Sequence, residues 1–192
     1  MHNLNLPNLL TLSRIFLVPF ILAGMAQAGR WSCLFAVMAF GLAAFTDFID
    51  GYLARSGNQV TRLGKFLDPL ADKVLVCSVL VMLVQLGWVA AWVAILIICR
   101  DILVTGLRAI AADEGVVIAA DNFGKAKTIM QMLALAPLIL HHTWFGVPMH
   151  DLGIFLLYIA LALTIFSGCN YFWSFSRIWR EKPPVDNRSK DA

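Results

Sequence analysis

The sequence contains few charged residues. Only 14% of its 192 residues are charged, whereas 60% are hydrophobic, and a typical soluble domain has about 25% charged residues. The apolar residues form long runs, and a run of about 20 is long enough to cross a bilayer. This composition argues against an ordinary soluble domain and predicts a multi-pass membrane protein. The net charge of +3 is small, and no nucleic-acid partner is expected.

Several other patterns are missing. The four cysteines lie apart in apolar runs and form no CxxC pair, so we interpret them as buried thiols rather than as a disulfide framework. The four histidines show no helical ligand spacing with the aspartates, which argues against a zinc site. The first apolar run lacks a basic region before it, and further apolar runs follow it. It is therefore predicted to be a retained helix and not a cleaved signal peptide.

Six segments are long and apolar enough to be membrane helices, and turn-forming residues separate them. We predict spans at roughly residues 8–28, 33–54, 67–87, 89–112, 125–143 and 151–176. The stretch around Pro7 predicts a short N-terminal interfacial helix before them. The predicted fold is all-α and polytopic, with a membrane domain over residues 1–176 and a polar cytoplasmic tail over residues 177–192.

The lysines and arginines are distributed unevenly between the two ends of these spans. If the N-terminus is cytoplasmic, 12 of the 15 basic residues fall on the cytoplasmic side, and Arg30 alone clearly falls on the other side. Arg14 and Arg100 lie within spans. Because basic residues accumulate in cytoplasmic loops, we predict that the connection between the second and third spans is cytoplasmic.

Four of the chain's 12 acidic residues lie in that same region. Asp47 and Asp50 share one helical face near the end of the second span, and Asp68 and Asp72 share one near the start of the third. A short loop joins these two spans as antiparallel neighbours, so we expect both pairs to lie at similar depth and to converge. Close carboxylates repel one another unless cations neutralise them, and oxygen-only ligands favour Mg²⁺, Mn²⁺ or Ca²⁺ over zinc. The alternative is that these aspartates cap helices, with Asp68 as an N-cap before Pro69, and pair with nearby basic residues. An acidic residue inside a span is costly, which favours the metal site.

The stretch that begins at Asp47 resembles a known family signature. It reads DFIDGYLARSGNQVTRLGKFLDPLADK. This stretch resembles the signature of the CDP-alcohol phosphatidyltransferases, and every fixed position of that signature is filled. The segments LPNLLTLSRI, RDILVTGLR and GKAKTIMQM resemble the bacterial phosphatidylglycerophosphate synthase branch of that family. The resemblance extends over nearly the whole chain except the tail. It implies a six-helix enzyme, usually a homodimer, in which an alcohol displaces CMP from CDP-diacylglycerol. In this branch the alcohol is sn-glycerol 3-phosphate.

The resemblance also implies roles for individual residues. Metal ions, two Mg²⁺ or Mn²⁺, would be held by Asp47, Asp50, Asp68 and Asp72, and Asp72 would also be the general base. The CDP moiety would be bound by Asp47, Gly51, Ala54, Arg55 and Gly64. Asn8 either joins this CDP-binding set or caps the first helix. These residue types suit the reaction, because a carboxylate can take the proton of the attacking hydroxyl and no covalent nucleophile is needed.

A second group of basic residues lies in and after the fourth span. Arg100, Arg108, Lys125 and Lys127 are candidates for binding the phosphate of the acceptor, since guanidinium and ammonium groups are strong phosphate ligands. The alternative interpretations are membrane anchoring for the lysines and an ion pair for Arg100, either with Asp101 or with the second helix.

Three alternative functions make different predictions about the sequence. The same family includes enzymes with another acceptor, such as inositol phosphate, serine or phosphatidylglycerol. An intramembrane prenyltransferase would be expected to have more helices and a second aspartate-rich loop, and only isolated acids follow Asp72. A divalent-cation transporter would be expected to show an inverted repeat or a broken helix pair, and neither is visible.

Overall fold

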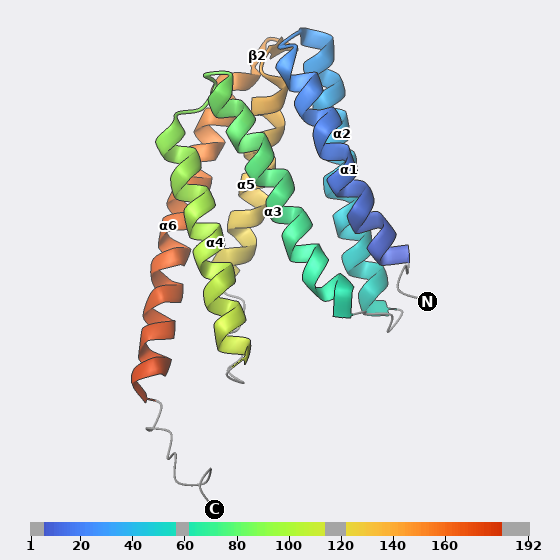
Figure 1. The fold of residues 1–192 in the computed structure, drawn as a ribbon. Coiled ribbons are helices and arrows are strands. Elements are labelled where there is room, and N and C mark those ends of the chain that lie inside the picture. The colour runs from blue at the N-terminus through green and yellow to red at the C-terminus, as the bar shows by residue number, and fades with distance from the viewer. Residues whose placement is uncertain (1–5, 57–61, 114–121, 182–192) are drawn as a thin grey trace, which may run out of the picture.

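A computed structural model describes residues 6–56, 62–113 and 122–181 (Figure 1). Side chains are described for residues 12–46, 70–71, 73–107, 109–111 and 126–173. The elements are α1 (Leu6–Ala26), α2 (Arg30–Ser56), α3 (Arg62–Gln85), α4 (Ala91–Asp113), α5 (Asn122–Leu140), β1 (Thr143–Trp144), β2 (Val147–Pro148) and α6 (Met149–Glu181). The predicted all-α class is confirmed, with one helix for each predicted span.

Two predicted boundaries differ from the structure. Within the described residues, α1 is one continuous helix from Leu6, so no separate interfacial helix is present there. Pro7 lies in its first turn, where a missing N–H leaves no hydrogen bond unmade. At the other terminus, α6 continues to Glu181, five residues into the predicted tail. The rest of that tail, residues 182–192, lies outside the described residues.

Local sequence explains how several helices end. After α3, the Trp88 N–H donates to the Leu83 carbonyl at 2.9 Å and the Gly87 N–H donates to the Val84 carbonyl at 3.0 Å. This is the Schellman pattern, and it requires the left-handed φ of 72° that Gly87 adopts. Before α2, the Ser32 hydroxyl accepts a hydrogen bond from the Gly29 N–H at 3.1 Å. The turns that the sequence predicts at these two places are therefore present.

The connection between α5 and α6 was predicted only as a break, and it forms a small hairpin. Strands β1 and β2 pair antiparallel, with Trp144 opposite Val147. The two central residues, Phe145 and Gly146, have φ values of 51° and 80°. Positive φ at both positions is typical of the type I′ turn, whose twist matches that of the flanking strands.

The six helices alternate in direction, so their ends gather at two ends of the bundle (Figure 1). One end, which we call the termini end, carries the start of α1 and the end of α6. The ends of α2 and α4 and the starts of α3 and α5 also lie there. The opposite end, the hairpin end, carries β1 and β2. The connections that the basic residues predict to be cytoplasmic therefore share the termini end.

The helices pack around α1 and α5. Among the described residues, α1 contacts both α2 and α3, α5 contacts α2, α3 and α6, and α4 contacts α3 and α6. The predicted close pairing of α2 with α3 is not among these main contacts, because α1 packs against both helices. The core at this junction is apolar and includes Ile21, Met25, Leu80, Leu83 and Leu135.

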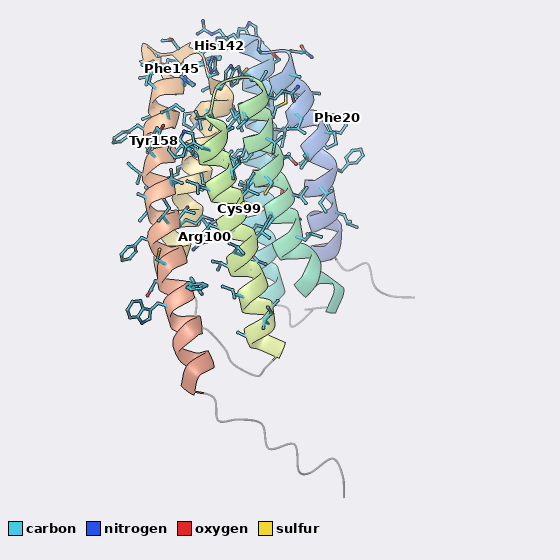
Figure 2. The ribbon with its side chains drawn as sticks, turned by 60° about the vertical axis from the view of Figure 1, so that its left-hand side comes forward. Phe20, Cys99, Arg100, His142, Phe145 and Tyr158 are labelled. Carbon is cyan, nitrogen blue, oxygen red and sulfur yellow. The ribbon has the colours of Figure 1, made fainter. Side chains whose placement is uncertain are left out.

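The outer surface is apolar as well. Large exposed side chains include Phe16, Phe20, Phe35, Met38 and Phe155, at 48–70% exposure, and Figure 2 shows Phe20 and Tyr158 pointing away from the bundle. By contrast, Arg14, Asp101, Lys127 and Gln131 are buried. A soluble monomer rarely exposes so much apolar surface, whereas a membrane protein places its polar groups inside.

Only part of the predicted set of six membrane spans is established by helix length and composition. Within the described residues, one stretch, Met149–Trp173, has the length and hydropathy of a membrane span, with a mean hydropathy of 2.3 over its most apolar window. Four shorter apolar stretches lie in α1, α2, α3 and α5. The six-span topology remains a prediction.

Candidate active site

The four aspartates of the signature lie on two helices that meet at the termini end. Asp50 lies six residues before the end of α2 and Asp68 lies six residues after the start of α3, so each is about 9 Å from its helix end. Asp47 and Asp72 are both deeper, at about 14–15 Å. Five residues join the two helices, which keeps their ends within about 20 Å of each other. The backbone thus brings the two pairs to matching depths.

The start of α3 shows whether Asp68 caps a helix that begins at Pro69. The helix begins at Arg62 and runs through Pro69 without interruption. The alternative in which Asp68 is an N-cap before Pro69 is therefore wrong, because seven helical residues already precede Pro69. Asp68 and Asp72 lie one turn apart on one helix, as the metal site requires. The side chains of all four aspartates lie outside the described set, so their convergence remains a prediction.

The predicted CDP-binding residues also belong to the termini end. Gly51, Ala54 and Arg55 lie in the last two turns of α2, and Gly64 lies in the first turn of α3. Asn8 lies inside the first turn of α1, which begins at Leu6. An N-cap precedes the helix, so the position of Asn8 argues against the capping alternative. The side chains of these residues are not among those described.

Arg14 is a residue that the sequence analysis did not assign to the site. It lies eight residues into α1, or about 12 Å from the helix start, and only 1% of it is exposed. Because α1 packs against both α2 and α3, this buried guanidinium lies at the depth of the aspartates. The signal that could have identified it is the rarity of charged residues inside spans, where they commonly mark functional sites.

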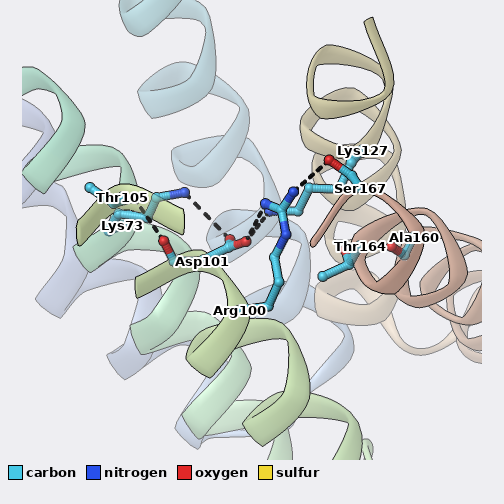
Figure 3. A network of polar contacts seen from close by, with 8 residues as sticks. All are labelled: Lys73, Arg100, Asp101, Thr105, Lys127, Ala160, Thr164 and Ser167. Carbon is cyan, nitrogen blue, oxygen red and sulfur yellow. Dashed lines mark hydrogen bonds and ion pairs between the residues drawn. The ribbon is translucent and has the colours of Figure 1, made fainter. Parts of the chain in front are cut away.

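A second polar cluster is described in atomic detail, and it centres on Asp101 in the middle of α4 (Figure 3). The Lys127 ammonium donates to Asp101 Oδ1 from α5. The Arg100 Nη1 group donates to the same oxygen at 3.2 Å. Lys73 Nζ donates to the other oxygen, Oδ2, from α3 at 3.4 Å. One carboxylate therefore joins three helices, and we call these four residues the Asp101 cluster.

Helix α6 holds the cluster from its other side. The Ser167 hydroxyl accepts a hydrogen bond of 2.6 Å from Arg100 Nη2, and Ser167 is fully buried. The next residue is Gly168, where an added Cβ would lie 3.1 Å from Arg100 Cγ. The absence of a side chain at Gly168 is what lets the Arg100 side chain pass along α6 to reach Ser167.

The Asp101 cluster carries an excess of positive charge. Lys73, Arg100 and Lys127 contribute three positive charges, and Asp101 contributes one negative charge. Lys127 is 2% exposed, so water does little to screen it. Arg100 Nε is buried and has no hydrogen-bond partner among the described residues. The two buried or half-buried cations, Lys127 and Arg100, keep N–H groups without a partner among the described residues, which makes this part of the cluster a candidate anion site.

The cluster and the aspartates share helix α3. Lys73 follows Asp72 directly in that helix, so the two sets of residues lie at the same depth along α3. Of the four basic residues predicted to bind the acceptor phosphate, the structure brings Arg100 and Lys127 together through Asp101. The other two, Arg108 and Lys125, lie in helical parts of α4 and α5, and their side chains are not described.

The ion pair between Arg100 and Asp101, expected as an alternative role for Arg100, is present. The sequence analysis did not predict that Lys127 and Lys73 share the same carboxylate, or that Ser167 joins Arg100. These partners are 26 to 67 residues apart in the chain, and no short motif connects them.

Comparison with known proteins gives matches over most of the chain. Residues 4–166 match the profile of a family described as CDP-alcohol phosphatidyltransferase. A Bacillus subtilis (strain 168) protein named CDP-diacylglycerol--glycerol-3-phosphate 3-phosphatidyltransferase is 41% identical over 180 residues, which cover 88% of this chain and 93% of that protein. Proteins of the same name from Rickettsia felis and Shigella flexneri serotype 5b are each 40% identical, over 88% and 87% of this chain and 93% and 92% of their own length.

Proposed function

Since this chain belongs to the CDP-alcohol phosphatidyltransferase family, we propose that it transfers the phosphatidyl group of CDP-diacylglycerol to sn-glycerol 3-phosphate. The products are phosphatidylglycerophosphate and CMP. The curated relatives named for this reaction support the proposal, because they match nearly the full length of both chains. The observation that supports it is the position of the four signature aspartates along α2 and α3, in two pairs at matching depths from the helix ends that five residues join.

The aspartates fit a divalent-cation site by their chemistry. Asp47, Asp50, Asp68 and Asp72 offer only oxygen ligands, and four carboxylates near one another need cations to be tolerated. We propose that they would hold two Mg²⁺ or Mn²⁺ ions. Such ions, when bound, neutralise negative charge on the diphosphate and on the departing phosphate.

The residues of the chain would then carry out the transfer as follows. The Asp72 carboxylate accepts the proton of the acceptor hydroxyl as its oxygen attacks the β-phosphorus. The bond from that phosphorus to the CMP oxygen breaks, and CMP leaves with the bonding electrons. Asp72 later releases the proton to water. Gly51, Ala54 and Gly64 would leave room for the nucleotide, with Asn8 and Arg55 beside it.

The Asp101 cluster would bind the second phosphate. Glycerol 3-phosphate carries a phosphate monoester of about −1.5 to −2 charge at neutral pH, and Lys127 and Arg100 offer it cationic N–H donors from two helices. Lys127 and Arg100 would contact this phosphate, and Arg108 and Lys125 would complete the pocket. A charged pocket favours a phosphorylated acceptor over one without a phosphate, such as serine. The names of the curated relatives favour glycerol 3-phosphate over inositol phosphate.

The membrane setting suits a donor with two acyl chains. The family is associated with membranes, and we propose that this chain lies in the inner membrane with its termini end in the cytoplasm, where water-soluble glycerol 3-phosphate and CMP are found. The basic residues at that end support this orientation. We also propose a homodimer, which the family resemblance implies.

The test is CMP release by the purified protein in detergent with CDP-diacylglycerol and Mg²⁺ or Mn²⁺. Release is expected with glycerol 3-phosphate and not with serine, inositol phosphate or phosphatidylglycerol. Asp72→Asn should abolish it, whereas Asp151→Asn, which changes an exposed aspartate at the hairpin end, should not. Release that is independent of glycerol 3-phosphate would refute the acceptor. Metal uptake into proteoliposomes without the nucleotide lipid would instead favour a transporter.

A further inference from the structure

We propose that Asp101 is a positioning residue for the acceptor's phosphate. It would not touch the substrate. Its carboxylate would hold Lys127 and Arg100 in the arrangement that receives the phosphate, and would also form an ion pair with Lys73. This inference rests on the proposed function, because it assigns a role within the acceptor pocket.

The hydrogen bonds of Asp101 show why it acts through its neighbours. Both carboxylate oxygens already accept N–H donors, Oδ1 from Lys127 and Arg100 and Oδ2 from Lys73. The residue is 4% exposed, and as an acceptor of hydrogen bonds it would repel a phosphate oxygen. Its contribution is therefore to place the donors that surround it.

The donors have capacity left for a ligand. An ammonium has three N–H groups, and the described residues supply Lys127 with one partner, Asp101. Arg100 uses Nη1 for Asp101 and Nη2 for Ser167, and its buried Nε has no partner among the described residues. A phosphate oxygen is an acceptor that fits such unused N–H groups, and its negative charge strengthens hydrogen bonds from cationic donors.

The carboxylate is also what allows the cations to converge. Lys127 lies between the positive charges of Lys73 and Arg100, which share its partner. Without Asp101, the buried Lys127 ammonium would face like charges and no described counter-ion. It would turn away from its position, and α3, α4 and α5 would lose the carboxylate that connects them among the described side chains.

The experiment measures KM for glycerol 3-phosphate and for CDP-diacylglycerol in Asp101→Asn, which keeps the shape of the side chain and removes its charge. We expect KM for glycerol 3-phosphate to rise at least about tenfold, because one partner of a buried, hydrogen-bonded charge pair is lost. KM for CDP-diacylglycerol should stay within about twofold, since the pocket for the other substrate is not touched. The matched control is Thr105→Val on the same helix, which should leave both KM values unchanged. Among the described contacts, the Thr105 hydroxyl donates only to the Asp101 backbone carbonyl and does not reach its carboxylate.

A double-mutant cycle with Lys127→Met separates positioning from a general effect on the fold. If Asp101 acts mainly through Lys127, then Asp101→Asn should add little to the KM of Lys127→Met. An equal rise in both backgrounds would overturn the proposal, as would an unchanged or lower KM in the single variant. Should Asp101→Asn fail to fold alone, the double variant removes both charges of the pair. Comparing its KM for glycerol 3-phosphate with that of Lys127→Met then tests whether Asp101 acts through Lys127.

Inorganic phosphate gives a readout that does not depend on the reaction. It should raise the unfolding temperature of the wild-type protein in detergent, with a clearly smaller effect in Asp101→Asn. A wild-type protein that uses no glycerol 3-phosphate would refute the proposed function, and the phosphate measurement would then decide the role of Asp101. Equal stabilisation of both proteins by phosphate would overturn the inference even if the enzyme were active.

Discussion

The contact between α5 and α6 at Gly153 gives a sharp prediction of stability. Gly153 is buried in the first turns of α6, where an added Cβ would lie 2.6 Å from Leu138 Cγ and 2.9 Å from the Leu138 backbone nitrogen. The Leu138 side chain is itself fully buried. The backbone atom cannot rotate away, so Gly153→Ala would force the two helices apart by several tenths of an ångström.

The expected cost combines two opposing effects. Overpacking a close contact usually costs about 1–3 kcal/mol, and replacing a helical glycine with alanine returns roughly 0.5–1 kcal/mol. The overpacking dominates, because the contact involves backbone as well as side chain. Gly153→Ala should therefore lower the free energy of unfolding by about 1–2 kcal/mol.

The assay is thermal unfolding in detergent, with Gly41→Ala as the matched control. Gly41 lies in α2, and an added Cβ there would meet nothing within 4 Å. The same substitution should therefore leave stability unchanged or raise it slightly. CMP release by the folded Gly153→Ala protein should persist, because Gly153 lies near the hairpin end. A variant as stable as the wild type would refute the close packing of α5 on α6.

Three further predictions follow from other parts of the structure. Gly168→Ala should raise KM for glycerol 3-phosphate by displacing Arg100, whose Cγ would lie 3.1 Å from the new Cβ, and an unchanged KM would argue against a role for Arg100. Removal of divalent cations with a chelator should abolish CMP release, and added Mg²⁺ or Mn²⁺ should restore it; activity that persists in excess chelator would contradict the aspartate metal site. Burial lowers the pKa of His141 at the hairpin end, and His150 and His142 lower that pKa further. The folded state therefore prefers neutral His141, and stability should fall as the pH drops below about 6.5. His141→Asn should reduce this dependence on pH, and unfolding temperatures measured from about pH 8 to 5 would test it.

The hairpin end explains the direction of this pH effect. The His141 ring stacks on Trp88 at 3.7 Å between centroids, and its neighbours His150 and His142 lie at 4.9 and 5.6 Å. A proton on His141 would place a positive charge in a partly buried position beside two titratable rings, and burial and those rings both disfavour it. Asparagine is the chosen replacement because His141 has a φ of 55°, a left-handed conformation that asparagine tolerates.

The sequence by itself determined the helices and the position of the aspartates. Apolar runs, turn residues and basic residues are local signals, so they located six helices and predicted which connections lie together at one end. The spacing of Asp47 with Asp50, and of Asp68 with Asp72, follows from the helical period alone. Depth along a helix is also set by counting residues, which is why the two pairs could be predicted to match.

Only the tertiary structure decided which distant residues meet. The packing of α1 against both α2 and α3, the burial of Arg14, and the three helices joined at Asp101 depend on how helices rotate and cross, which no local period encodes. Lys127 could be predicted as a phosphate ligand from its charge, but its counter-ion lies 26 residues away on another helix. A buried charge takes its partner from whatever helix the packing brings next to it, and that packing depends on the whole bundle.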